Sequence, residues 1–94
     1  MLLIREVFMA KPGMASKLAK LMKETMSGPG KVKVMTDMVG NYNTVVVEYE
    51  VESLTAFEKM MAEYMNMKPK DRAKMAGYAD MYMKGRREIF RILS

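Results

Sequence analysis

Apolar and polar positions along the chain predict four β-strands. Residues 2–9 form an apolar run interrupted only by Arg5 and Glu6, whereas residues 31–38 and 44–51 alternate between two faces. The intervening residues 39–43 contain a glycine and two asparagines, which tolerate the left-handed backbone of a hairpin loop. The closing residues 85–94 alternate as well, but both faces of that strand carry charged and large apolar side chains.

Two other regions have the apolar spacing of amphipathic helices. The first runs from Met14, has lysines on its polar side, and is expected to end at Gly28-Pro29-Gly30. Ser53 is expected to cap the second by accepting a hydrogen bond from a backbone N–H group one turn ahead. The apolar face of this second helix is expected to comprise Leu54, Phe57, Met61, Tyr64 and Met65.

The second helical region is expected to break at Lys68-Pro69-Lys70 and to resume at Asp71. We expect Gly85 to be the left-handed residue that ends the resumed helix. The residues of this part expected to point inward are Met75, Tyr78, Met81 and Tyr82.

This order of elements predicts a single α+β domain over residues 1–94 with a ferredoxin-like βαββαβ fold and a four-stranded antiparallel sheet. Right-handed crossovers place strands 2–9 and 44–51 side by side at the centre, and we expect these two to run parallel. Both helices of this fold cover the same sheet face, yet the strands are apolar on both. We therefore expect a homodimer in which a second copy covers the other face, although a different protein or a tetramer could cover it equally well.

Composition limits the available chemistry. The 94 residues include no Cys, His or Trp, so we expect no metal site and no cofactor. Fourteen methionines lie mostly on the inward helix faces, where thioethers fill core space, although thioethers can also hold Cu(I). No apolar stretch is long enough for a membrane span or a signal peptide, which predicts a cytoplasmic protein with no membrane partner.

The net charge of +5 is divided along the chain. Basic side chains dominate residues 1–35 and 67–94, whereas acidic side chains dominate residues 36–66. A nucleic-acid-binding protein would more often show a continuous basic stripe, and acids on strand 44–51 would repel phosphate. We therefore expect no nucleic-acid partner.

Carboxylates, tyrosines and lysines remain for acid–base chemistry. Glu48, in the middle of a central strand, is a candidate catalytic residue, and Arg87 or Arg91 would hold an anionic group of the ligand. Alternatively, Glu48 pairs with an arginine of the first or last strand across the dimer. Tyr64 is the second catalytic candidate. The remaining candidate ligand-binding residues are Asn41, Asn43, Tyr78 and Tyr82. Alternatively, the tyrosines at 64, 78 and 82 are half-buried packing residues whose hydroxyl groups reach water.

Three stretches resemble the dimeric α/β-barrel superfamily, which includes antibiotic-biosynthesis-type monooxygenases, stress-responsive barrel proteins and NIPSNAP-like proteins. They are FMAKPGMASKLAKLMKE (8–24), VVVEYEVESLTAFEKMM (45–61) and GRREIFRI (85–92), the last being most similar to NIPSNAP-like domains. The resemblance implies a ferredoxin-like fold and a dimer. Members that degrade haem or act as cofactor-independent oxygenases typically use His or Trp beside an Asn, and this chain has neither His nor Trp.

Two functional hypotheses follow. The first is a small homodimer that binds a small, largely apolar ligand, as a cofactor-free monooxygenase or isomerase. The second is a non-catalytic dimeric interaction or assembly module, which the lack of His, Cys and Trp favours.

Overall fold

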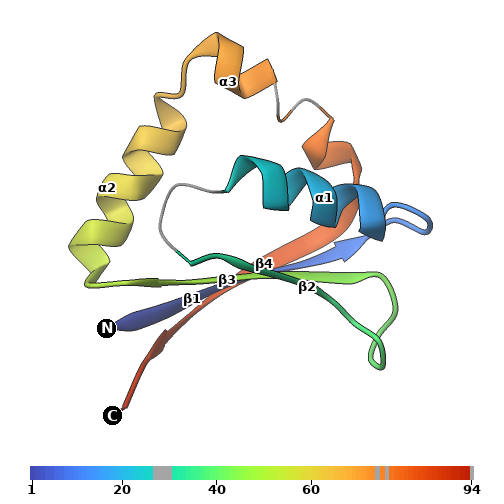
Figure 1. Cartoon of the computed structure of the whole chain (residues 1–94), viewed down its shortest axis with the longest axis horizontal. Helices are drawn as coiled ribbons and strands as arrows, with labels where there is room; N and C mark the ends of the chain where they lie inside the picture. Colours follow the sequence, from blue (N-terminus) through green and yellow to red (C-terminus); the bar gives the residue numbers. More distant parts are fainter. Residues whose placement is uncertain (27–30, 74, 76, 94) are drawn as a thin grey trace.

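The computed structural model describes residues 1–26, 31–73, 75 and 77–93. The elements follow in the order β1 (Leu2–Ala10), α1 (Ala15–Thr25), β2 (Lys33–Thr36), β3 (Thr44–Val51), α2 (Leu54–Met65), α3 (Pro69–Ala73), the 3-10 helix η1 (Tyr78–Asp80) and β4 (Tyr82–Arg91). The strands form one four-stranded sheet in the order β2-β3-β1-β4. The helices of the described residues lie on one side of this sheet (Figure 1). The predicted ferredoxin-like α+β fold is confirmed.

The expectation that the two central strands run parallel is wrong. β1 and β3 are antiparallel neighbours, with Arg5 opposite Glu48. The α1 crossover makes β2 follow the direction of β1, and the hairpin then reverses the direction of β3. The three neighbouring strand pairs are therefore all antiparallel.

The sequence predicted one helix that resumes at Asp71 and includes Tyr82, and this prediction is wrong. α3 ends at Ala73, η1 spans only 3 residues, and Tyr82 already belongs to β4. The left-handed residue is Gly77, with φ 83°, whereas Gly85 lies inside β4. The backbone at Gly77 interrupts the helical path, and pairing with β1 draws the following residues into the sheet.

The first helix and the start of the second follow the prediction. Leu18 and Met22 of α1 are buried, and its lysines are exposed. The expected helix stop at Gly28-Pro29-Gly30 lies outside the described residues. Ser53 caps α2, because its Oγ accepts a hydrogen bond of 3.1 Å from the backbone N–H of Ala56. Within the described residues, no helix combines the length and apolar character needed to cross a membrane.

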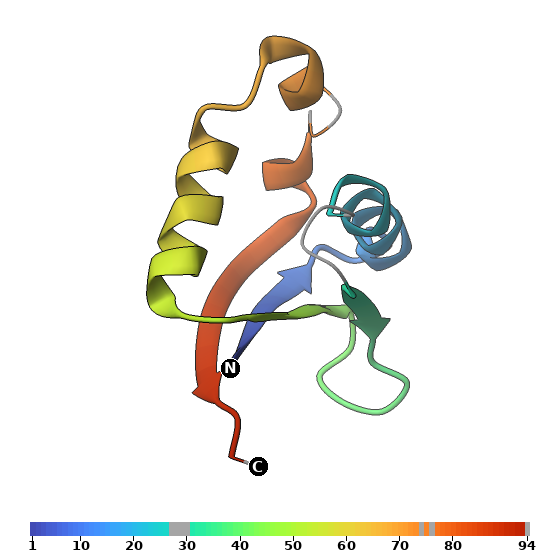
Figure 2. The ribbon, with the colours of Figure 1, turned by 60° about the vertical axis from the view of Figure 1, so that its left-hand side comes forward.

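The core lies between the helices and one face of the sheet, which we call the helix face. Alternate residues of β1 and β3 supply most of it, together with Leu18 and Met22 of α1 and Phe57 of α2. α2 rises from the end of β3 and leans away from the sheet (Figures 1 and 2). Phe57 is consequently the buried residue of α2, and the predicted inward packing is wrong for the exposed side chains of Leu54, Tyr64 and Met65.

The opposite face of the sheet carries no helix in the described part of the chain, and we call it the bare face (Figure 1). Strand alternation turns the side chains of Leu3, Arg5, Val7 and Met9 toward it. Phe90 is opposite Leu3, and 47% of its surface is exposed. Large apolar groups therefore remain in contact with water on this face.

Candidate functional site

A cavity of about 110 Å³ lies between the helix face of the sheet and the helices, and we call it the helix-side cavity. Its volume is on the scale of a cavity that holds a single aromatic ring. Flexible thioethers and rigid rings form most of its wall, which consists of Met22, Met26, Met61, Met75, Phe8, Tyr49, Tyr64 and Tyr78.

Among the described residues, two charged side chains line this cavity, and they pair with each other. Glu6 of β1 and Arg87 of β4 are directly opposite in the sheet, and Arg87 Nε lies 2.5 Å from Glu6 Oε1. The hydroxyl of Tyr49 donates to the same oxygen over 3.5 Å. Only 12% of the Glu6 side chain is exposed, so these partners rather than bulk water stabilise its charge.

The Arg87 side chain also contacts the second helix. Its guanidinium carbon lies 5.2 Å from the centre of the Phe57 ring of α2. A guanidinium group is attracted to the face of an aromatic ring, and its planar shape suits simultaneous pairing with a carboxylate. Arg87 is therefore held between Glu6 on one side and Phe57 on the other, which fixes the charged group at the cavity.

Two phenols of the cavity keep their protons at neutral pH. Burial raises the pKa of Tyr49 to about 12, and the negative charge of Glu6 adds to this effect, while Arg87 opposes it. The pKa of Tyr78 is also raised, first by burial and then by a side-chain hydrogen bond with Tyr82. Both hydroxyls therefore remain hydrogen-bond donors, of which the one on Tyr49 serves Glu6, and neither is suited to remove a proton from a ligand.

Phe8, Tyr78 and Tyr82 form an aromatic cluster beside the cavity. Their ring centres lie 5.9, 5.0 and 5.3 Å apart in the three pairs. Gly85 lies opposite Phe8, and a Cβ atom at this position would come within 3.1 Å of the Phe8 ring. The missing side chain at Gly85 thus lets the Phe8 ring pack closely against β4.

The structure brings several predicted site residues to this cavity. Tyr64, Tyr78 and Arg87 line it, and Tyr82 contacts Tyr78 beside it. The sequence interpretation missed Glu6 as a site residue. A signal was present, because strand alternation places this carboxylate on the same face as Ile4 and Phe8, which are both buried.

Other predicted site residues lie elsewhere. Glu48 is on the bare face, so the structure does not bring it together with the tyrosines of the cavity. Asn41 and Asn43 belong to the loop between β2 and β3 and do not line the helix-side cavity. Arg91 is exposed at the end of β4, opposite Leu2.

Glu48 belongs to a row of charges across the bare face. Arg5 Nε lies 2.9 Å from Glu48 Oε2, and Arg5 Nη1 lies 3.1 Å from Glu88 Oε1. Lys33 on the edge strand β2 is opposite Glu48. Positive and negative side chains therefore alternate across the four strands, and Glu48 pairs with an arginine of its own chain.

No family model and no curated protein matches the sequence, but solved structures share the fold. A NIPSNAP-like domain protein from Burkholderia xenovorans superposes with a TM-score of 0.85 at 16% identity, over 99% of this chain and 85% of that protein. A NIPSNAP family protein from Agrobacterium tumefaciens gives 0.82 at 17%, over 96% and 86%. A protein from Chloroflexus aurantiacus, provisionally assigned as an antibiotic biosynthesis monooxygenase, gives 0.74 at 11%, over 99% and 93%.

At these identities the comparisons concern the fold. The chain has the ferredoxin-like fold of NIPSNAP-domain proteins and of proteins assigned to the antibiotic biosynthesis monooxygenases, which confirms the predicted resemblance in fold.

Proposed function

We propose that the protein binds a small, largely apolar ligand in the helix-side cavity and places a polar group of that ligand at Glu6 and Arg87. The supporting observation is the Glu6–Arg87 pair, which lies inside a wall of thioethers and aromatic rings. Small-molecule sites typically combine such apolar walls with a few convergent polar groups that orient the ligand. The thioethers would adapt to the shape of the ligand, and the ion pair would set its orientation.

The same pair would support a simple proton transfer. The Glu6 carboxylate would accept a proton from the bound molecule, and Arg87 would stabilise the negative charge that forms on the ligand. Removal of a proton next to an oxygen-bearing carbon begins both isomerisation and cofactor-free oxygenation. The provisional assignment of the Chloroflexus aurantiacus protein as a monooxygenase is consistent with this extension through the shared fold.

The proposed functional unit is a cytoplasmic homodimer formed through the bare face. This face exposes Phe90, Ile92 and Met35, and burial of apolar surface contributes roughly 25 cal/mol per Å². A two-fold arrangement would cover the same surface on both copies at once. It would leave the helix-side cavity of each copy on the outer side of its sheet.

Native mass spectrometry of the purified protein tests ligand binding without assuming the ligand. We expect a mass above that of the 94-residue chain or its dimer, and release of a small molecule when the protein is denatured. The Arg87→Gln variant should retain less of this molecule, because its polar group loses a charged partner. Lys20→Gln removes an exposed positive charge of α1 that does not line the cavity and should retain as much as the wild type.

Binding of 4-fluorophenol, followed by fluorine NMR, tests the polar contact. The Glu6→Gln variant should bind it about tenfold more weakly, because a hydrogen bond to a charged acceptor is replaced by one to an amide. Fluorobenzene lacks the hydroxyl and should bind equally to both proteins. Absence of saturable binding for both compounds, together with no co-purified molecule, would contradict the proposed ligand site.

The assembly-module hypothesis depends on a different observation, the apolar bare face. If dimerisation were the whole function, Glu6→Gln and Arg87→Gln would leave the dimer intact and no ligand would be found. The two sets of measurements therefore separate the hypotheses.

A further inference from the structure

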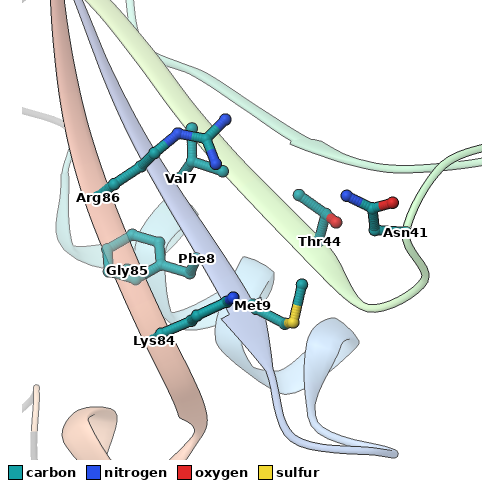
Figure 3. A pocket seen from close by; sticks show the side chains of 8 residues that line it. All are labelled: Val7, Phe8, Met9, Asn41, Thr44, Lys84, Gly85 and Arg86. Carbon is teal, nitrogen blue, oxygen red and sulfur yellow. The ribbon is translucent and has the colours of Figure 1, made fainter.

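A second cavity opens on the bare face, at the end of the sheet next to the β2–β3 loop. Its volume is about 250 Å³, and we call it the sheet-face hollow (Figure 3). Arg86 and Lys84 extend from β4 across β1, and Thr44 and Asn41 lie on the far side of β1 (Figure 3). Four different segments of the chain thus contribute to one concave surface.

The hollow is positively charged. Arg86 uses Nε to contact Glu88 Oε2 at 3.2 Å, which leaves its two terminal nitrogens for another partner. Lys84 forms no ion pair among the residues that the structure describes. Within the same described part, the lining contains no acidic side chain, whereas Thr44 and Asn41 add neutral hydrogen-bond donors. The hollow can therefore donate hydrogen bonds to an anion from several directions.

The floor of the hollow is apolar. Val7 and Met9 line it, and Val7 is only 9% exposed although no described helix covers this face. Figure 3 shows the guanidinium group of Arg86 next to Val7 and the amine of Lys84 next to Met9. A ligand that carries both an anionic group and a short apolar body fits this combination better than a bare inorganic anion.

The hollow is also distant from the part of the bare face that is most exposed and apolar. Lys84 is opposite Met9, whereas Phe90 is opposite Leu3. Lys84 and Phe90 are 6 positions apart along β4, which corresponds to about 20 Å. Stacking of two copies centred on Phe90 would place the hollow toward the rim of the interface, since Met35 shares a cross-strand row with Val7 and Arg86.

We infer that the sheet-face hollow is a binding site for small organic carboxylates, in which Arg86 and Lys84 hold the carboxylate and the β1 side chains contact the apolar body. Charge complementarity carries this inference, because Lys84 has no ion-pair partner among the described residues and the Arg86–Glu88 contact leaves the two terminal nitrogens of Arg86 to a ligand. The site lies on the opposite face of the sheet from Glu6 and does not depend on the proposed function.

Titration of the ¹⁵N-labelled full chain with sodium benzoate and with benzamide tests the site. Benzoate should shift the backbone amide signals of Gly85 and Thr44 in a saturable way, and benzamide, which has the same ring without the charge, should bind at least tenfold more weakly. Arg86→Gln and Lys84→Gln should each weaken benzoate binding about three- to tenfold. Both side chains are exposed, so the fold should be retained.

Two variants control for the charge and for the face. Lys17→Gln and Lys20→Gln each remove an exposed positive charge from α1, on the helix side of the sheet, and each should leave benzoate binding at the hollow unchanged. Equal binding of benzoate and benzamide, or shifts confined to residues around Glu6, would overturn the inference. Inorganic phosphate binding as tightly as benzoate would overturn it too, because the apolar floor would then contribute nothing.

Discussion

Arg86 and Arg87 are neighbours in the sequence, but the pleat of β4 gives them opposite surroundings. Arg87 contacts Glu6 and Phe57 under the helices, whereas Arg86 contacts Glu88 on the bare face. Conservative substitution of either residue therefore reports on one face of the sheet. Arg87→Gln therefore tests the helix-side cavity, and Arg86→Gln tests the sheet-face hollow.

The raised pKa of Tyr49 leads to a prediction of how the stability of the fold changes with pH above pH 10. An unfolded tyrosine releases its proton near pH 10, whereas the pKa of folded Tyr49 is raised to about 12. The folded chain thus holds more protons in this interval, and stability is lost as the pH rises through it. The Tyr49→Phe variant should lose about 1 to 2 kcal/mol less than the wild type between pH 10 and 12 in urea unfolding.

A second tyrosine variant provides the control for this measurement. Tyr42→Phe removes an exposed hydroxyl in the β2–β3 loop and should follow the wild-type curve. Parallel curves for Tyr49→Phe and the wild type would show that the buried phenol does not contribute to the alkaline loss of stability.

The sequence predicted only part of the candidate site. Tyr64, Tyr78 and Arg87 were predicted and do line the cavity, because helix spacing and strand alternation give the direction of a side chain. Glu6 was missed, and Glu48, which was proposed together with the tyrosines, lies on the other face of the sheet. Alternation alone does not say which face of a strand meets the helices when both faces carry charged and apolar groups.

At the level of elements, α2 packs less closely against the rest of the molecule than α1 does. It leans away from the sheet, and Phe57 is its buried residue (Figure 2). Few tertiary contacts would therefore compensate for the loss of a hydrogen bond at either end of α2. The local cap at Ser53 should contribute more to this helix than a cap would to a fully packed one.

The Ser53→Ala variant should destabilise α2 by about 1 kcal/mol, because the N–H of Ala56 loses its acceptor. Hydrogen exchange followed by mass spectrometry should show faster exchange in α2, with little change in β1 and β3. Ser16→Ala on α1 is the matched control, since that serine is exposed and α1 has no side-chain cap. An equal effect of both variants on α2 would contradict the capping role.

Element prediction succeeded where one periodicity was clear. The predicted strand 44–51 has the bounds of β3, and the Ser53 cap is confirmed. It failed between Asp71 and Tyr82, where apolar residues at helical spacing belong partly to η1 and partly to β4. Pairing with β1 and the left-handed backbone of Gly77 override the local pattern there.

At the scale of the molecule, one layer of helices faces one sheet, and no helix of the described residues covers the second sheet face (Figure 1). The fold could be predicted because the order of elements and their crossovers leave few topologies. The predicted parallel direction of the two central strands was nevertheless wrong. Their antiparallel direction follows from the hairpin between β2 and β3, which reverses the chain. What covers the bare face is a property of the assembly and stays a prediction.

Phe90→Asp tests that prediction. A charge at this exposed apolar position should weaken self-association roughly thirtyfold or more if Phe90 lies at the centre of a dimer interface. Sedimentation velocity should then show a dimer for the wild type and a monomer for the variant. Met65→Ser, which changes an exposed side chain of α2 in the other layer, should remain dimeric. A wild-type chain that stays monomeric at high concentration would contradict the dimer.

The order of charges on β1 and β4 has a consequence for folding accuracy. β4 is an edge strand with β1 as its neighbour, and Glu6 faces Arg87 while Arg5 faces Glu88. Sliding β4 by one residue in one direction would set Glu6 against Glu88, and sliding it the other way would set Arg5 against Arg87. Either misalignment brings like charges together and is disfavoured. The four side chains therefore favour the native register of β4, which keeps Arg86 on the bare face and Arg87 on the helix face.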